Sequence, residues 1–194
     1  FVNNHCYRAD ELAVMMDLAK EMGFKITAFH HTIEAYKVAD LLAENDVCAV
    51  MWSDWWGYKL EALDGVLENI ALVEKAGACA IAHSDSEAVM QRMNQEIAKA
   101  MAAGNRIGLD ISRAEAIRWI TSNPARAMRI DDKVGSLEVG KNADAVIWTT
   151  DPFSVYALAQ HVFIDGAHIY DRYDPSKQPQ SDYELGIVTR GDHQ

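Results

Sequence analysis

The sequence predicts an α/β fold, in which a parallel sheet covered by helices is followed by a small antiparallel β unit. First, strand-like segments alternate four times with helical patterns over residues 1–104, the order that builds a parallel sheet. Second, polar residues follow each strand, and none of these turns contains a GxGxxG phosphate loop. This favours a (β/α)8-type barrel over a doubly wound sheet. Third, an Asp-Gly pair separates two alternating segments near residue 165, which is typical of a hairpin.

The four strands of the parallel sheet are expected at Phe1–Asn4, Lys25–Phe29, Val47–Trp52 and Cys79–Ala82. Val47–Trp52 is apolar throughout, as a strand buried on both faces should be. Apolar residues at helical spacing predict helices over 12–22, 35–42, 60–75 and 89–101. Gly23, Gly77 and Gly104 stand where these helices are expected to end.

A different pattern follows Gly104. Ser112 and Glu115 form a capping box at the start of a helix that reaches Asn123. An apolar strand is expected at 145–148, and a hairpin at 162–170 around Asp165-Gly166. We therefore expect three regions: residues 1–130 for the α/β part, 131–172 for part of a small β-sandwich domain, and 173–194 for a loose polar tail.

The composition excludes several classes of function. The chain has 194 residues and a net charge of −11, which argues against nucleic acid or an anionic membrane as a partner. No apolar run approaches the roughly 20 residues of a membrane-spanning helix. Three widely spaced cysteines without a CxxC argue against a disulfide framework or a thiolate zinc site. The compartment stays open between cytoplasm and periplasm or secretion, because a signal peptide upstream can be neither seen nor excluded.

Three residues at strand ends could together form a metal site. His5, His31 and Asp85 each follow a different expected strand, and imidazole with carboxylate is the donor set of catalytic zinc. His30 is the alternative to His31, because only one of two adjacent residues can point inward. Taken singly, each histidine could be hydrogen-bonded to backbone, and Asp85 could cap a helix. Their recurrence along one sheet edge favours the metal site.

Five segments carry a resemblance to a known family. The sequence resembles the C-terminal half of an amidohydrolase-superfamily enzyme, nearest to the imidazolonepropionase-like and prolidase-like branch. The segments are Asn4–Cys6 (NHC), Phe29–His31 (FHH), Ala82–Ser86 (AHSDS), Thr121–Ala125 (TSNPA) and Gly135–Asp144 (GSLEVGKNAD). The last is the most specific, since in that family it leads into a small β domain. The resemblance extends to about Arg172.

The resemblance implies strands 5 to 8 of a (β/α)8 TIM-type barrel and a metal-dependent hydrolase acting on C–N bonds. His5, His31 and Asp85 would bind one or two divalent ions, most simply zinc. Asp85 would also be the general base toward the attacking water and then the acid toward the leaving nitrogen. His83, two positions before Asp85, would either hydrogen-bond to that ligand or fill the barrel core.

The sequence departs from the family pattern in one respect. The family's His-x-His pair of the first strand, and the lysine or glutamate of its fourth, have no counterpart here. We therefore expect a fragment that lacks the N-terminal half and is inactive alone, with that missing half or a second copy of itself as a partner. The competing hypothesis is a non-catalytic half-barrel scaffold or subunit.

The expected substrate is a dipeptide-like molecule or an N-acyl amino acid. Tyr7 and Arg8 follow His5, and arginine suits a bidentate grip on a carboxylate, although both could simply be exposed. Trp55 and Trp56 could wall an apolar pocket or pack their loop on the barrel. A cyclic amide, as in an imidazolonepropionase-like enzyme, is the second substrate class. No role is assigned to His161, His168 or His193, and the methionines are expected in the core.

Overall fold

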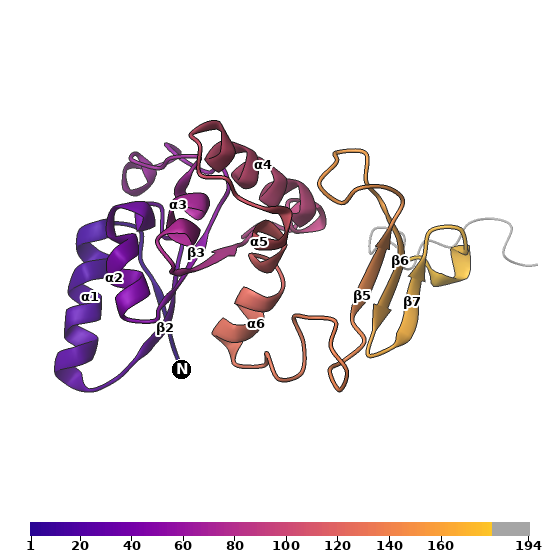
Figure 1. Cartoon of the computed structure of the whole chain (residues 1–194), viewed down its shortest axis with the longest axis horizontal. Coiled ribbons are helices and arrows are strands. Elements are labelled where there is room, and N and C mark those ends of the chain that lie inside the picture. Colours follow the sequence, from indigo (N-terminus) through magenta and orange to yellow (C-terminus); the bar gives the residue numbers. More distant parts are fainter. Residues whose placement is uncertain (180–194) are drawn as a thin grey trace, which may run out of the picture.

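A computed structural model describes residues 1–179, which form two separate sheets (Figure 1). Residues 1–128 contain a four-stranded parallel sheet and six helices, and a three-stranded antiparallel sheet follows. Both sheets were predicted. Among residues 1–179, no helix is long and apolar enough to cross a bilayer.

The strands are β1 (Val2–His5), β2 (Ile26–His30), β3 (Cys48–Met51), β4 (Cys79–Ala82), β5 (Ala145–Trp148), β6 (Ala159–Ile164) and β7 (Ala167–Asp171). The helices are α1 (Ala9–Met22), α2 (Ala39–Glu44), α3 (Asn69–Lys75), α4 (Met93–Arg106), α5 (Arg113–Arg118) and α6 (Ser122–Met128).

The parallel sheet has the strand order β1-β2-β3-β4, so consecutive strands are neighbours. One face carries the main core, because Phe29 and Met51 pack there with Leu12 of α1, Ile70 of α3 and Trp119 after α5. All five are almost completely buried. The helices thus cover one face, and the strand ends meet at a common edge.

The opposite face is lined by smaller side chains. Ala28, Val50 and Ile81 cluster there with Ala127 of α6. Asn123 of the same helix donates to the Ala80 carbonyl at 2.7 Å. Helix α6 therefore packs against the edge strand β4, and its Ala127 reaches the face opposite the main core.

Local sequence signals place several element ends as expected. Gly23 follows α1 in the left-handed region with φ of 71°. Ser112 and Glu115 form the predicted capping box of α5, in which each side chain accepts from the other residue's backbone N–H. Asp165 and Gly166 both have positive φ and connect β6 to β7 in the predicted hairpin.

The helix expected over residues 60–75 is wrong as a single element. The structure has a 3₁₀ turn at Leu60–Ala62, and helix α3 begins only at Asn69. Gly65 lies between them in contact with the loop, and a Cβ atom there would come within 2.7 Å of the Trp56 Cβ. Leu60 is 85% exposed, so the apolar periodicity did not mark a buried face.

The next helix also differs from the prediction. A 3₁₀ turn at Met90–Arg92 precedes α4, which continues past Gly104 to Arg106. Gly104 is therefore not an end signal. It lies against Ala71 of α3, where an added Cβ would clash, so the glycine permits close helix packing.

The expectation of no disulfide is also corrected. Cys48 and Cys79 form a disulfide between β3 and β4, while Cys6 is free and buried. The two cysteines are 31 positions apart in sequence but are direct partners in the parallel register. Cysteine spacing alone does not reveal this register, so the pairing could not be predicted from the sequence.

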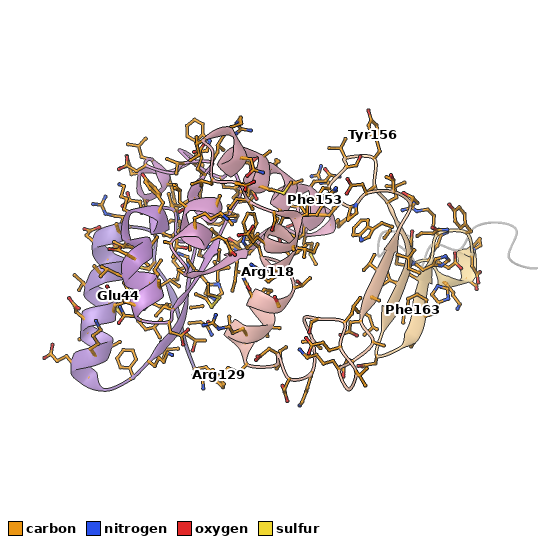
Figure 2. The ribbon with its side chains drawn as sticks, viewed as in Figure 1. Glu44, Arg118, Arg129, Phe153, Tyr156 and Phe163 are labelled. Atoms are coloured by element: carbon orange, nitrogen blue, oxygen red, sulfur yellow. A yellow bond between two sulfur atoms is a disulfide. The ribbon has the colours of Figure 1, made fainter. Side chains whose placement is uncertain are left out.

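The second sheet has the order β5-β6-β7, and its β5–β6 loop reaches back to the helices. Asn94 of α4 donates to the Pro152 carbonyl at 2.7 Å. Phe153 belongs to this loop (Figure 2). The guanidinium of Arg113 lies 4.8 Å from the centre of its ring. The boundary near residue 130 stays a prediction. Within the expected tail, Pro175–Lys177 forms a 3₁₀ helix beside β7, and residues 180–194, including His193, lie outside the described part.

Candidate active site

The carboxyl ends of the four parallel strands bring together the histidines expected at a metal site. His5 ends β1 and is paired in register with His30, which ends β2. His31 is the next residue, and His83 and Asp85 lie just beyond β4. Parallel strands place their carboxyl ends along one edge, so residues separated by up to 80 positions meet there.

His31 lies between His5 and Asp85. Its ring centre is 4.3 Å from that of His5, and its Nδ1 is 3.9 Å from Asp85 Oδ2. His30 instead has its Nε2 3.4 Å from the side-chain oxygen of Asn3. His31 therefore has short distances to both other predicted ligands, while burial and then the charges of His5 and Asp85 also act on the pKa of His30.

Two buried nitrogens at this edge have no hydrogen-bond partner among the described residues. They are Nδ1 of His31 and Nε2 of His83. Buried polar atoms are almost always satisfied, so two orphaned imidazole nitrogens side by side fit a cation-binding site. The arrangement is open: the donor atoms of His5, His31 and Asp85 do not all lie within 4.8 Å of one another.

Burial keeps these imidazoles neutral. It lowers the pKa of His31 to about 4, with the nearby His5 as the next cause. It lowers the pKa of His83 to about 3, and the pKa of His30 is also lowered, first by burial and then by His5. Neutral imidazole carries the lone pair that a metal ion needs, so these side chains are available as ligands at neutral pH.

Both His31 and Asp85 have left-handed backbone conformations. Their φ angles are 63° and 49°. Residues with side chains adopt this region at a cost, unless the surroundings hold them there, and such residues cluster at functional sites. The chain therefore turns sharply at two of the three predicted ligands.

Aromatic side chains form a wall beside the histidines. The Trp52 ring stacks 4.7 Å from His31 and 4.8 Å from His83, and its Nε1 donates to the Ser84 carbonyl at 3.2 Å. Trp55 stacks on Trp52 at 5.4 Å. Trp56 points elsewhere and is 58% exposed. Of the two adjacent tryptophans, only Trp55 joins this wall.

The two predicted substrate-binding residues differ in their placement. Tyr7 is buried, 5.0 Å from His5 between ring centres, and its hydroxyl is 3.4 Å from that of Tyr58. Arg8 is exposed at the start of α1, where its Nε donates to Asp10 at 3.0 Å. The ammonium of Lys59 lies 3.8 Å from the centre of the Tyr7 ring. Lys59 is thus the cation beside the histidines.

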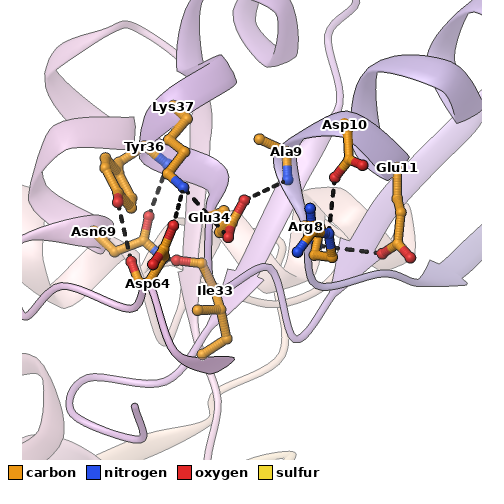
Figure 3. A network of polar contacts seen from close by, with 10 residues as sticks. All are labelled: Arg8, Ala9, Asp10, Glu11, Ile33, Glu34, Tyr36, Lys37, Asp64 and Asn69. Atoms are coloured by element: carbon orange, nitrogen blue, oxygen red, sulfur yellow. Dashed lines mark hydrogen bonds and ion pairs between the residues drawn. The ribbon is translucent and has the colours of Figure 1, made fainter. Parts of the chain in front are cut away.

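A buried polar network holds the loop that follows His31 (Figure 3). The Asn69 amide donates to the carbonyls of Thr32 and Ile33 at 2.8 and 3.0 Å, and its oxygen accepts from the Tyr36 N–H at 2.9 Å. Glu34 accepts from the first N–H of α1 at 2.9 Å. The loop after β2 is therefore fixed to α3 on one side and to α1 on the other.

Comparison with known proteins decides the family. A family model described as the amidohydrolase family matches residues 31–169. The chain belongs to this family. The amidohydrolase tasK of Hapsidospora irregularis is 30% identical over 174 residues, which cover 88% of this chain and 17% of that protein. An imidazolonepropionase of Picrophilus torridus is 37% identical over 71 residues, 34% of this chain and 18% of that enzyme.

The solved structures agree with this assignment. A Thermotoga maritima amidohydrolase superimposes with a TM-score of 0.79 at 29% identity, covering 88% of this chain and 43% of that one. The chain thus spans less than half the length of the relatives it matches. The resemblance stated from the sequence motifs is thus confirmed.

Two features of the site and one cluster outside it were not predicted. Lys59 and Asn69 were given no role, because only the folded loops bring Lys59 over Tyr7 and Asn69 to the backbone that follows His31. His161 and His168, which were also assigned nothing, lie together with Asp171 on the antiparallel sheet. Their positions on either side of the Asp-Gly turn were the available signal.

Proposed function

We propose that this chain supplies strands 5 to 8 of a (β/α)8 barrel in a metal-dependent amidohydrolase that cleaves an amide or peptide C–N bond. Residues 1–130 would be the half-barrel, and residues 131–172 part of a small β-sandwich domain. One observation carries the proposal: His5, His31 and Asp85 converge at one sheet edge, where a buried His31 nitrogen has no hydrogen-bond partner among residues 1–179.

The proposed ligands are His5, His31 and Asp85, holding one or two divalent ions such as zinc. When bound, such an ion polarises a carbonyl group and makes water nucleophilic at neutral pH. Asp85 is 55% exposed, so its carboxylate can accept a proton from the attacking water. It then returns this proton to the leaving nitrogen as the C–N bond breaks. The products are an acid and an amine.

His83 is a positioning residue in this proposal. Its ring centre is 4.9 Å from that of His31 and 4.8 Å from that of Trp52, so it contacts both rings. Because burial keeps its imidazole neutral, it adds no positive charge that would repel a cation. His83 and Trp52 together exclude water from the inner side of His31.

The substrate is proposed to be a dipeptide-like molecule or an N-acyl amino acid. Trp52 and Trp55 offer an apolar wall, while Lys59 and Tyr7 offer a cation and a hydroxyl for a carboxylate. Arg8 would add a bidentate contact if it exchanged Asp10 for the substrate. Lys59 is the better placed of the two cations, since it lies against Tyr7.

Binding measurements on the zinc-loaded chain test this substrate class. Quenching of tryptophan fluorescence would be titrated with a dipeptide and with its C-terminal amide. We expect tighter binding of the free acid, and a loss of this preference in Lys59→Met. Lys25→Met is the matched control, because Lys25 pairs with Asp46 at 2.7 Å and precedes β2, at the end of that strand opposite His30. Equal affinity for acid and amide would contradict the proposal.

A cyclic amide is the second candidate, favoured by the matching segment of the imidazolonepropionase. A hydantoin or imidazolone ligand would be added to the same titration. If it quenched the fluorescence at lower concentration than any dipeptide, and without dependence on Lys59, the cyclic-amide function would replace the dipeptide proposal.

A further inference from the structure

Three side chains gather on one face of the antiparallel sheet, away from the parallel-sheet edge. His161 lies on the central strand β6, and His168 and Asp171 lie on β7. His161 Nδ1 is 3.1 Å from His168 Nε2 and 3.5 Å from Asp171 Oδ2, and the last two atoms are 4.0 Å apart. Groups of three or more histidine, cysteine, aspartate or glutamate residues can hold a metal ion. Among residues 1–179, this group is the one in which one donor atom from each residue lies within 4.8 Å of the others.

A β-bulge makes the gathering possible. His168 and Asp171 are three positions apart, so a regular strand would send them to opposite faces. The register changes here: Asp171 pairs with His161 and Tyr170 with Val162, but His168 pairs with Phe163, which leaves Ile169 unpaired. The extra residue brings His168 back to the face of His161 and Asp171. Bulges often re-aim a side chain at a functional site.

The three atoms have the spacing of metal ligands. A point equidistant from them lies about 2.1 Å from each, which is the length of a zinc–nitrogen bond. Two histidines and one carboxylate with a fourth position for water are a known zinc donor set. The side chains are 20–27% exposed, so an ion can enter from solvent while most of each ligand stays fixed.

The surrounding residues hold the ligands in place. The Phe163 ring stacks on His168 at 4.7 Å with an interplanar angle of 19°. Lys177, in the 3₁₀ helix beyond β7, has its Nζ 3.1 Å from His168 Nδ1. An ammonium donates to a nitrogen lone pair, and this favours the tautomer with hydrogen on Nε2. Lys177 therefore competes with a metal ion for His168, both through the tautomer and through its charge.

We propose that His161, His168 and Asp171 form a second divalent-metal site, selective for zinc-like ions, in the small β unit. A bound ion would link β6 to β7 beside the hairpin. The site shares no residue with the proposed active site, and it does not depend on the proposed function. Lys177 sets its affinity, because the ammonium must leave His168 Nδ1 when the ion binds.

Cobalt titration of the full chain tests the site. Co²⁺ is added to His31→Ala, in which the other candidate site is disabled, and visible absorption is followed. We expect one equivalent bound with an intense low-coordinate spectrum. His168→Ala or Asp171→Asn in this background should weaken binding about tenfold or more, since even the loss of an outer-shell partner has that effect. Lys177→Met should bind several-fold tighter.

Asp165→Asn is the matched control. It removes a carboxylate from the turn of the same hairpin, outside the cluster, and asparagine tolerates the positive φ at that position. Its cobalt affinity should equal that of the background. Asp171→Asn keeps the shape of the side chain, and its far-UV circular dichroism shows whether the sheet is intact. Absence of cobalt uptake, or uptake unchanged in a folded Asp171→Asn variant, would overturn the proposal in favour of a hydrogen-bonded His161–His168–Lys177 chain.

Discussion

Replacing Asn69 with alanine tests how the loop after β2 is held. Asn69 is 3% exposed and makes three hydrogen bonds to the backbone of residues 32–36, directly after His31. Alanine removes all three. The Thr32 carbonyl still accepts from the Ala35 N–H at 3.2 Å, whereas the Ile33 carbonyl and the Tyr36 N–H lose their partner. The loop would then lose its attachment to α3, and His31 its fixed position between His5 and Asp85.

The magnitude follows from the number of bonds. A net contribution of about 1 kcal/mol for each hydrogen bond gives a destabilisation of about 3 kcal/mol. For a chain of this length, 1 kcal/mol lowers the melting temperature by about 2–4 °C. The Asn69→Ala variant should therefore melt about 6–12 °C below the wild-type chain.

The assay combines thermal unfolding, followed by circular dichroism, with zinc titration at the parallel-sheet edge. Asn105→Ala is the control, since Asn105 makes two hydrogen bonds with the backbone of Ile111, far from the histidines. By the same count, its two bonds give a melting temperature about 4–8 °C below that of the wild type, but it should bind zinc like the wild type. Asn69→Ala should also bind zinc more weakly. Unchanged zinc affinity in Asn69→Ala would refute the idea that this network positions His31.

Two further predictions concern the glycines of the segment Gly135–Asp144 and the three cysteines. Gly135→Ala should destabilise the chain by about 1 kcal/mol or more relative to Gly140→Ala. Both glycines have positive φ, so the backbone strain of alanine is shared. A Cβ atom at position 135 would come within 2.6 Å of the Ala125 Cβ, whereas a Cβ atom at position 140 would meet open space. Equal melting temperatures of the two variants would contradict this. For the thiols, burial and then Glu11 raise the pKa of Cys6 to about 12, so it stays protonated at pH 8. It should react slowly with a disulfide reagent in the native state. Denatured without reductant, the chain should show one thiol, and after reduction three; three thiols without reductant would contradict the β3–β4 disulfide.

The sequence predicted elements whose signals are local. The Asp165-Gly166 turn and the Ser112 capping box depend on residues within a few positions of one another, so pattern and structure agree. The parallel sheet was also predictable, because each of its strands is a short apolar run between helical patterns. The helix over 60–75 failed for a physical reason: its leucines are exposed, and Gly65 interrupts it.

Features that depend on register could not be predicted. The Cys48–Cys79 pairing requires the alignment of β3 with β4, and the His161–His168–Asp171 cluster requires a bulge at Ile169. At the candidate active site, the motifs identified the histidines and Asp85. The contribution of Lys59 emerged only from the folded loop, which places its ammonium over Tyr7.

We propose that His31, not its neighbour His30, binds a metal ion together with His5 and Asp85. Calorimetric titration with zinc tests this in His31→Ala and His30→Ala, each in a His168→Ala background that removes the cluster on the small sheet. We expect His31→Ala to lose the remaining zinc binding and His30→Ala to retain it. If His31→Ala retained zinc and His30→Ala lost it, His30 would be the ligand and the proposed site would be wrong.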